Sequence, residues 1–440
     1  MGEKFGTMEK MVDNKKIIII GAGVAGLAAS YYLKSKGITS YVYDMHSVPG
    51  GLSRSFKIGD LYFDYGGHCT FAKDKEIREI LESGIEYHNS VADGYNYKNG
   101  KWIKHPVQNN LKLLDTDEKI NIIKSFIERE DNKNPNNYQE WLYSVYGIYY
   151  SDNYPRLYTQ KYWTVEPQLL ETKWVGPRMY KSNIDEILRG AFEEETPNVH
   201  YSNGIRYPKS GGFDMFLKNM VRNSNIKYNS CVTKIDTMNK IVFFSDGKYV
   251  EYDYIISTIP LPEYQNILAG IDEEVVIAMK NLDYTTLHLV SIGLKRNNHI
   301  PSNCFYIYDQ NILPSRVYST TQMAGRKEGN VSLQAEVYTS KYKAINLSEE
   351  EIKRQCINQL MEMGVFNRED ILFEDIRVEK YANIMFTHGI YDNREIVHTY
   401  LDEQDIVYAG RFGEWDYLWT DQGMASGTKA AKKVESRING

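Results

Sequence analysis

The chain has 440 residues, more than one typical hydrophobic core takes up, so we expect two or three domains. Its composition, 42% hydrophobic and 25% charged, is typical of a soluble globular protein, and no run approaches the ~20 apolar residues that span a bilayer. The net charge of −6 gives no overall basic field, which argues against nucleic acid as a partner. The four cysteines show no CxxC or metal-ligand spacing, so we expect free thiols, a reducing compartment and no metal site.

Residues 1–14 are charged and lack the apolar run of a secretory signal. Gly6 stands where a myristoylation signal needs serine or threonine. We therefore expect a disordered leader, no membrane insertion and a cytoplasmic protein.

The stretch 15–44 contains a short apolar run, a glycine motif, an amphipathic run and a second apolar run that ends at Asp44. This order predicts a β-α-β unit that binds a dinucleotide, with the pyrophosphate at the helix N-terminus. Asp44 lies about 20 residues after the glycines, where a carboxylate can accept a hydrogen bond from a ribose hydroxyl. The glycines of the motif are Gly21, Gly23 and Gly26.

A second glycine turn follows this unit and is expected to reach the far side of the same pyrophosphate. It consists of Gly50, Gly51, Leu52 and, two residues later, the cation Arg54. Further on, two glycines precede His68, which suggests a backbone that passes close to a flat ring. The alternative is an ordinary loop histidine.

The middle of the chain changes character. Residues 95–103 predict a hairpin with Asn99-Gly100 at its turn. Residues 111–195 show helical patterns without strand-like alternation, which predicts a helical insertion. Within it, the aromatic and polar stretch 162–178 fits either helix packing at a domain junction or a ring platform at a ligand cleft.

The second half predicts more strands, then an antiparallel sheet and a closing strand and helix. The expected strands are 227–233, 240–244, 249–258, four strands within 284–340, 371–381, and 405–409 running into a glycine turn. The expected helices are 213–221, 347–363 and 423–438.

Several motifs resemble known families. GAGVAGL, PGGLSRS, FDYGGH and AGRFG are similar to flavoproteins of the amine oxidase and protoporphyrinogen oxidase superfamily, whose cofactor is FAD. GGHCTF, HPVQNN, KYWTVEPQLLETKWVGPR, IRYPKSGGF and GRFGEWDYLWTDQ resemble the UDP-galactopyranose mutase family, particularly its eukaryotic-type members.

This resemblance implies an α/β fold with a Rossmann-like FAD-binding domain, a helical insertion and an antiparallel β-sheet substrate domain. The FAD-binding domain would comprise 15–110, 206–283 and 401–440. Residues 111–205 would form the helical substrate-binding insertion, and 284–400 the sheet of the substrate domain.

The resemblance also implies roles for individual residues. Arg316 and Arg411 would clamp the substrate diphosphate, and His68 would lie beside the flavin N5. The implied substrate-binding residues are Gln108 (uridine), Trp163, Arg178 (sugar), Tyr306, Arg316, Tyr417 and Asp421. The implied cofactor-binding residues are Gly21, Gly23, Gly26, Asp44, Gly50, Gly51, Leu52, Arg54, Gly67, His68, Gly410, Arg411, Gln422, Met424 and Ala425.

The activity implied is a non-redox isomerisation between the pyranose and furanose forms of a nucleotide-diphosphate sugar, such as UDP-galactopyranose and UDP-galactofuranose. In this family the N5 of reduced FAD attacks the anomeric carbon, so NAD(P)H or another reductant is needed. A homo-oligomer is compatible with the sequence, which does not fix the oligomeric state.

Three residues depart from the family pattern: His105 replaces an aromatic residue, Asp416 a basic residue and Asp421 an asparagine. A carboxylate near a diphosphate repels it unless the carboxylate is paired or turned away. Two alternatives therefore stay open, an FAD-dependent oxidoreductase of the amine oxidase or protoporphyrinogen oxidase type and a catalytically idle flavin-binding homologue.

Overall fold

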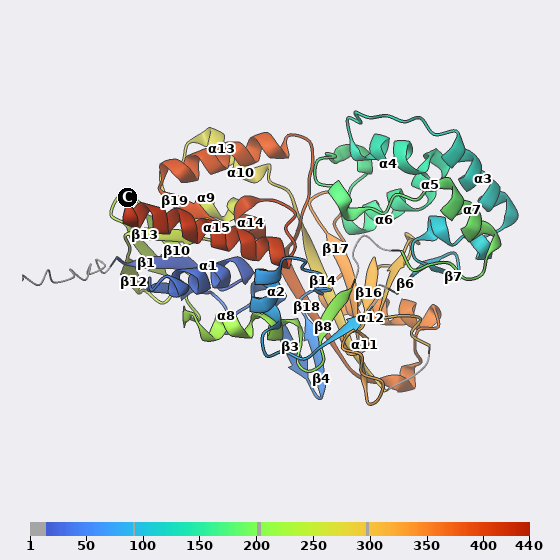
Figure 1. Cartoon of the computed structure of the whole chain (residues 1–440), viewed down its shortest axis with the longest axis horizontal. Helices are drawn as coiled ribbons and strands as arrows, with labels where there is room; N and C mark the ends of the chain where they lie inside the picture. Colours follow the sequence, from blue (N-terminus) through green and yellow to red (C-terminus); the bar gives the residue numbers. More distant parts are fainter. Residues whose placement is uncertain (1–14, 91–92, 200–203, 296–298) are drawn as a thin grey trace, which may run out of the picture.

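The structure, a computed structural model, describes residues 15–90, 93–199, 204–295 and 299–440. The predicted leader 1–14 lies outside the described residues. Figure 1 shows two sheets: a parallel one beneath two long helices at the end that carries the C-terminus, and a larger one at the centre. A group of helices lies beyond the central sheet, at the end opposite the C-terminus.

The first sheet has five parallel strands in the order β19-β13-β1-β2-β9. All four residues of its middle strand β1 are buried, as its continuous apolar run predicts for a parallel sheet covered on both faces. The strands are β1 Ile17–Ile20, β2 Ser40–Tyr43, β9 Asn225–Lys227, β13 Tyr254–Ser257 and β19 Ile406–Tyr408.

Two helices pack against each other beside this sheet (Figure 1), α1 Val24–Ser35 and α15 Thr420–Asn439. Their approach is close, since a Cβ on Gly427 would come within 1.9 Å of the Ala25 carbonyl oxygen. Helix α15 begins three residues before the predicted start at Gly423. At its start the Trp419 amide donates to the Gln422 side-chain oxygen, and the Gly423 amide donates to the Trp419 carbonyl.

Because α15 starts earlier, the three predicted cofactor-binding residues near its start differ in their exposure. Met424 lies one turn inside the helix and is buried in the core, whereas Gln422 and Ala425 are exposed. The predicted glycine turn before α15 is also wrong, since Gly410–Glu414 forms a short helix, α14.

Two predicted strands are each divided between sheets. Residues 227–233 split into β9 and β10, because Asn229 adopts a positive φ of 53° between them. Residues 249–258 split into β12 and β13. The Tyr252 amide donates to the carbonyl of Lys240, just before β11, and the Asp253 amide donates to that of Lys16, just before β1 of the other sheet. The resulting small antiparallel sheet contains β10 Val232–Asp236, β11 Ile241–Phe244 and β12 Tyr249–Glu251.

The central sheet has seven strands in the order β18-β14-β17-β16-β15-β6-β7. It is antiparallel, as predicted, except that β6 and β15 pair in parallel. The hairpin β6-β7, which the predicted division places with the cofactor-binding segments, adds to this sheet. The strands are β6 Gly94–Lys98, β7 Lys101–Lys104, β14 Tyr284–Leu294, β15 Cys304–Ile307, β16 Arg316–Tyr318, β17 Val331–Thr339 and β18 Ile371–Ile384.

Two short antiparallel pairs connect the sheets. These are β3 Ser55–Ile58 with β4 Leu61–Asp64, and β5 Tyr87–Ser90 with β8 Ile205–Pro208. The predicted helix 213–221 is instead a 3-10 turn, Phe213–Leu217, followed by α8 Lys218–Arg222. The other helices outside the insertion are α2 Lys75–Glu82, α9 Tyr264–Ile267, α10 Glu273–Lys280, α11 Thr320–Met323, α12 Glu349–Glu362 and α13 Ile390–Glu403.

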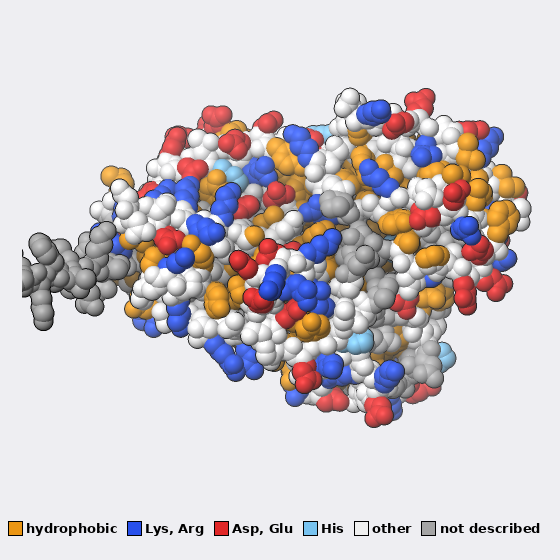
Figure 2. Space-filling model, viewed as in Figure 1, with side chains coloured by type: hydrophobic (Ala, Val, Ile, Leu, Met, Phe, Trp, Pro, Cys, Tyr) orange, Lys and Arg blue, Asp and Glu red, His pale blue; other side chains and the backbone are white. Residues whose placement is uncertain are grey.

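The helical insertion is confirmed. It contains α3 Thr116–Ile127, α4 Tyr138–Tyr146, α5 Ile148–Asn153, α6 Pro155–Tyr162 and α7 Ile184–Phe192. In the described part of the chain, no helix combines the length and apolar character needed to cross a bilayer. Figure 2 shows basic and acidic side chains interspersed on the face in view.

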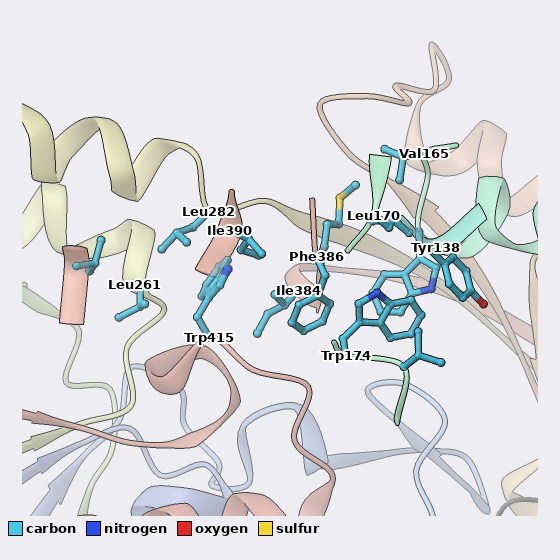
Figure 3. Close-up of a cluster of buried hydrophobic side chains, with 14 of the residues drawn as sticks. Tyr138, Val165, Leu170, Trp174, Leu261, Leu282, Ile384, Phe386, Ile390 and Trp415 are labelled. Atoms are coloured by element: carbon cyan, nitrogen blue, oxygen red, sulfur yellow. The ribbon is translucent and has the colours of Figure 1, made fainter. Parts of the chain in front are cut away.

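An aromatic cluster joins the insertion to the rest of the molecule (Figure 3). Trp174 stacks on Phe386, just beyond the end of β18, with ring centroids 5.9 Å apart. Trp163 meets Trp174 edge-on at 5.0 Å, and both indoles are buried. Tyr417, in the loop between α14 and α15, lies against both indoles. Trp163 and Trp174 of the stretch 162–178 therefore pack at a junction, which is the first of its two predicted interpretations.

Candidate functional site: a glycine cradle and an arginine-lined cavity

The turn between β1 and α1 brings backbone against backbone. Gly21 has a φ of +98°, and a Cβ there would lie 2.0 Å from the Thr258 hydroxyl oxygen. A Cβ on Gly26 would lie 1.9 Å from the Gly21 carbonyl oxygen. Only glycine fits either position, so the N-terminus of α1 lies directly over the end of β1.

The second glycine turn lies beside the first, as the sequence predicts. The Gly50 amide donates to the Ala22 carbonyl at 2.8 Å, and a Cβ on Gly51 would lie 3.1 Å from the Cα of Gly23. A third segment joins them at Gly410, whose φ is +81° and whose Cβ would meet that of Ala25 at 2.9 Å. These three segments, the glycine cradle, surround the N-terminus of the 12-residue helix α1, where free backbone N–H groups favour a phosphate.

Asp44 follows directly after β2 and is bonded to Ala22 in the turn of the cradle. Its Oδ2 accepts a hydrogen bond from the Ala22 amide at 2.6 Å, and its Oδ1 accepts one from the His46 amide at 2.8 Å. Burial raises the pKa of Asp44, but the bonds from His46 and Ala22 outweigh it and hold the pKa below its usual value. The carboxylate is therefore ionised and able to accept a further bond. Its role toward a ribose stays a prediction.

Arg54 has a partner that the sequence does not indicate. Its Nη1 donates to the Gly51 carbonyl at 2.6 Å, and its Nη2 binds Glu379 of β18 at 2.5 Å. The buried guanidinium also lies over the Tyr65 ring, 3.8 Å from its centroid. The cation expected at the pyrophosphate is thus held in place by the central sheet.

A cavity opens next to the cradle, and Leu52 of the second glycine turn forms part of its wall. It brings together segments far apart in the sequence, among them the turn before His68, strands β16 to β18 and the loop between α14 and α15. Of the predicted site residues, the cavity wall contains Leu52, Gly67, His68, Arg316, Arg411, Tyr417 and Asp421.

Arg316 lies on the cavity wall and forms an ion pair with Glu336. Its Nε and Nη2 each donate at 2.7 Å to the carboxylate of Glu336, which lies opposite it on β17. Glu336 is fully buried and also accepts bonds from the Gly67 amide and the Tyr338 hydroxyl, both at 3.0 Å. Burial lowers the pKa of Arg316, but Glu336 more than offsets it and holds the guanidinium charged.

Arg411 differs from Arg316 because a carbonyl oxygen is its main partner. Its Nε and Nη2 donate to the Leu418 oxygen at 3.0 and 2.7 Å. Across the described ranges, no carboxylate lies within ion-pair distance of it. The ring of Tyr417 lies near two guanidinium groups: its centroid is 5.3 Å from that of Arg411 and 4.7 Å from that of Arg178.

His68 is held by its own turn. Its Nδ1 lies 2.8 Å from the Gly66 carbonyl oxygen, which can only accept, so Nδ1 carries the proton. Burial, with the nearby charges of Arg411 and Arg316, lowers the pKa of His68 to about 4 against the bond to Gly66. At neutral pH the ring is therefore neutral, and its Nε2 is an acceptor.

Four predicted substrate-binding residues are absent from the cavity wall: Gln108, Trp163, Arg178 and Tyr306. Gln108 is buried and accepts a bond from the Tyr150 hydroxyl at 2.6 Å, and Tyr306 packs on His105 with ring centroids 4.9 Å apart. Arg178 binds the Tyr417 carbonyl at 2.5 Å.

The two aspartates that depart from the family pattern separate in space. Asp416 accepts a bond from the Tyr417 amide, lies 3.7 Å from Arg394 of α13, and is absent from the cavity wall. Asp421 faces the cavity from the first turn of α15.

The sequence did not indicate several residues of the wall. Glu336 is the most consequential, and its signal was a charged residue in the middle of the buried strand β17. The others with polar or aromatic side chains include Tyr338, Asn383 and Trp419. Tyr162 also lies on the wall, and it begins the stretch for which a ring platform at a ligand cleft was one of the two predicted interpretations.

The cradle and the cavity together fit a flavin nucleotide. The glycines let three backbone segments meet at the N-terminus of α1, where N–H groups favour a phosphate. Asp44 offers an ionised acceptor, and the adjoining cavity has the Gly67–His68 backbone and aromatic rings on its wall. The residues that would hold the group are those of the cradle, with His68 and Arg411 at the cavity.

Comparison with known proteins agrees with this fit. The pattern of the family described as flavin containing amine oxidoreductase matches residues 24–434. The chain is 35% identical over 71 residues to protoporphyrinogen oxidase 2 of Arabidopsis thaliana and 44% identical over 52 residues to 1-hydroxycarotenoid 3,4-desaturase of Flavobacterium sp. (strain P99-3). These matches cover 16% and 12% of this chain, and only 14% and 11% of those proteins.

A much longer likeness is to the structure of a reduced UDP-galactopyranose mutase. The two chains superpose with a TM-score of 0.88, 25% sequence identity and 96% coverage of each. The predicted α/β fold and the resemblance to the mutase family are thereby confirmed. The chain belongs to the flavin-containing amine oxidoreductase family, and within it the structure resembles a UDP-galactopyranose mutase over nearly its whole length.

Proposed function

We propose that the protein is an FAD-dependent mutase that interconverts the pyranose and furanose forms of a nucleotide-diphosphate sugar, with UDP-galactose as the first candidate. The observation that carries this proposal is the meeting of Arg316, Arg411, Tyr417 and His68 at one cavity of a mutase-like fold. The glycine cradle supports FAD as the cofactor, because it surrounds the N-terminus of α1, where backbone N–H groups favour a pyrophosphate, beside that cavity.

The side chains suit a reaction whose leaving group is a nucleotide diphosphate. Guanidinium groups bind phosphate oxygens through charge-assisted hydrogen bonds, which stabilise negative charge as it develops. Arg411 is the better placed, since a diphosphate oxygen is a stronger acceptor than the Leu418 carbonyl it now binds. Arg316 keeps its Nη1 for a ligand, because Glu336 occupies only Nε and Nη2.

The chemistry that a bound, reduced flavin supplies is a nucleophilic ring nitrogen. The chain itself orients the substrate and excludes water. His68 contributes a neutral ring whose Nε2 accepts a hydrogen bond at a fixed place, because its Nδ1 is committed to Gly66. We also propose that NAD(P)H or another reductant maintains the active state.

One experiment tests the proposal. The purified yellow protein is reduced with dithionite and given UDP-galactofuranose, and the formation of UDP-galactopyranose is followed by chromatography. We expect turnover by the reduced protein and none by the oxidised protein. If neither the reduced nor the oxidised protein turns over any of a panel of nucleotide sugars, the protein is a catalytically idle flavin-binding homologue.

An FAD-dependent oxidoreductase is the second candidate, favoured by the matches to a protoporphyrinogen oxidase and a desaturase. It predicts consumption of oxygen, or transfer of electrons to another acceptor, when the oxidised protein meets an amine, a porphyrinogen or a polyene. Such turnover without any mutase activity would replace the first proposal.

A further inference from the structure

The cavity wall carries four charged side chains: Arg316, Glu336, Arg411 and Asp421. The first two form a closed pair, since both oxygens of Glu336 bind the guanidinium of Arg316 at 2.7 Å. Glu336 is fully buried and has two further donors, so this pair is a fixed part of the wall. Together, Arg316 and Glu336 add no net charge to the cavity.

The other two charges are unpaired. Arg411 binds a neutral carbonyl oxygen through Nε and Nη2. Asp421 forms no ion pair, and its carboxylate accepts no hydrogen bond, within the part of the chain that the structure describes. The cavity thus offers a ligand one cation and one carboxylate that have no charged partner, besides the Nη1 donor of the paired Arg316.

This arrangement suits some nucleotide sugars better than others. The diphosphate of any nucleotide sugar carries two negative charges, which Arg411 attracts and Asp421 repels. A sugar with hydroxyl groups alone can donate a neutral hydrogen bond to Asp421. A sugar with a protonated amino group can form a charge-assisted bond to it and cancels part of the ligand's negative charge.

Asp416 provides an internal comparison. Asp416 lies five positions before Asp421, in the loop that follows α14, and is also an aspartate. Unlike Asp421, it lies outside the cavity wall, where it is close to Arg394 and accepts a hydrogen bond from the Tyr417 amide. Of the two carboxylates, Asp421 is therefore the one that a ligand can meet.

We propose that Asp421 is a specificity-determining residue, and that it selects a nucleotide sugar whose sugar carries a free amino group over one whose sugar is neutral. The proposal rests on the proposed function, because it concerns the substrate of the same cavity. Selection arises from attraction to the ammonium group and from repulsion of a diphosphate that has no such group.

Equilibrium binding to the flavin-loaded protein tests this inference. The probes are UDP, UDP-galactose, UDP-galactosamine and UDP-N-acetylgalactosamine, at a pH where the amine is protonated and the carboxylate ionised. UDP-N-acetylgalactosamine is the matched control, because it keeps a nitrogen substituent at the same position of the sugar but that nitrogen carries no positive charge. We expect UDP-galactosamine to bind about tenfold more tightly than UDP-galactose or the acetylated sugar, the range of one charged hydrogen bond.

Substitutions test whether the preference for the amino sugar depends on Asp421. Asp421→Asn should abolish the preference, mainly by tightening the binding of UDP-galactose, and Asp421→Ser provides a second neutral variant should the first fold poorly. Asp416→Asn, which removes the same charge outside the cavity wall, should keep the tenfold ratio. Flavin content and circular dichroism check that each variant is folded.

Two results would overturn the inference alone: equal affinities in the unaltered protein, or a preference that persists in Asp421→Asn. In both cases binding of UDP still supports a nucleotide-sugar site. If none of the four probes binds, UDP included, the proposed function fails and this inference fails with it.

Discussion

The glycine cradle and the cavity adjoin each other but are built on different physical principles. In the cradle, backbone lies against backbone, and a single Cβ on Gly26 would overlap the Gly21 carbonyl. In the cavity, side chains lie against side chains, and the carboxylate of Glu336 holds the guanidinium of Arg316. Steric fit restricts which side chains the cradle can hold, whereas the pairing of buried charges restricts which side chains the cavity can hold.

The difference shows which substitutions each region tolerates. The cradle should accept changes of charge nearby but no added atom at Gly21 or Gly26. The cavity should accept a change of size but not the loss of one partner of its buried ion pair. The following predictions separate the two regions, from the largest expected effect to the smallest.

Arg316→Ala should lower the free energy of unfolding by about 3–5 kcal/mol, because it leaves Glu336 buried without its cation. Chemical denaturation of the variant and of the unaltered protein measures the loss. The double substitution Arg316→Met with Glu336→Gln should recover much of it, because no charge is then left buried alone. A double variant as unstable as Arg316→Ala would contradict the charge-balance explanation.

Arg411→Ala is the contrasting substitution in the same cavity. It should change the stability by less than about 1 kcal/mol, because no buried carboxylate depends on Arg411. It should weaken UDP binding about tenfold to a hundredfold, the loss of a charged hydrogen-bonded partner. Unchanged UDP affinity, measured by flavin absorbance, would remove Arg411 from the proposed diphosphate site.

Gly26→Ala should cost about 3 kcal/mol in the free energy of unfolding and release much of the flavin, because helix α1 must move away from β1. Thermal denaturation and the flavin-to-protein ratio measure both effects. Gly423→Ala is the matched control: its Cβ would meet only a Val24 methyl at an ordinary 3.8 Å. Equal losses in the two variants would show that the close approach of Gly26 to Gly21 is not responsible.

His68 should make the protein less stable as the pH falls. The pKa of His68 is about 4 in the folded state and near 6.5 in the unfolded chain, so the unfolded state binds the proton first. Its contribution to stability is complete above about pH 6.5 and is lost as the pH falls toward 4, by about 2 kcal/mol at pH 5.

Asp64 changes the stability of the protein in the opposite direction over an overlapping pH range. Burial raises its pKa from 3.8 to about 7, against bonds from Ser55, Phe213 and Tyr207, so its contribution weakens as the pH rises through that range. The effect of His68 must therefore be read as the difference between the unaltered protein and His68→Gln. A difference that does not change between pH 7 and pH 5 would mean that His68 is not held neutral.

Tyr338→Phe should have the smallest effect, about 1 kcal/mol, because it removes one of the donors to Glu336 and leaves the ion pair with Arg316 intact. Tyr249→Phe, at an exposed position of β12, is the control and should leave the free energy of unfolding unchanged. A loss as large as that of Arg316→Ala would mean that the hydroxyl, not the arginine, holds Glu336.

The sequence alone predicted the cradle well. A glycine that must avoid a Cβ clash is a local requirement, and the run of β1, the turn and α1 covers fewer than 20 consecutive positions. The strands of the central sheet were also predictable from their alternation. The boundaries at Asn229 and Tyr252 were not, because they depend on which neighbouring sheet accepts the backbone bonds.

The cavity was predictable only in part. The arginines, His68 and Tyr417 could be placed by resemblance, but the pairing of Arg316 with Glu336 follows from the register of β16 on β17, which no local pattern specifies. Asp416 and Asp421 read alike in the sequence, and tertiary structure turned one to Arg394 and the other to the cavity. Sequence determined where backbone must come close, because that is a local steric condition; only tertiary structure decided which buried charges are paired, because partners come from distant strands and helices.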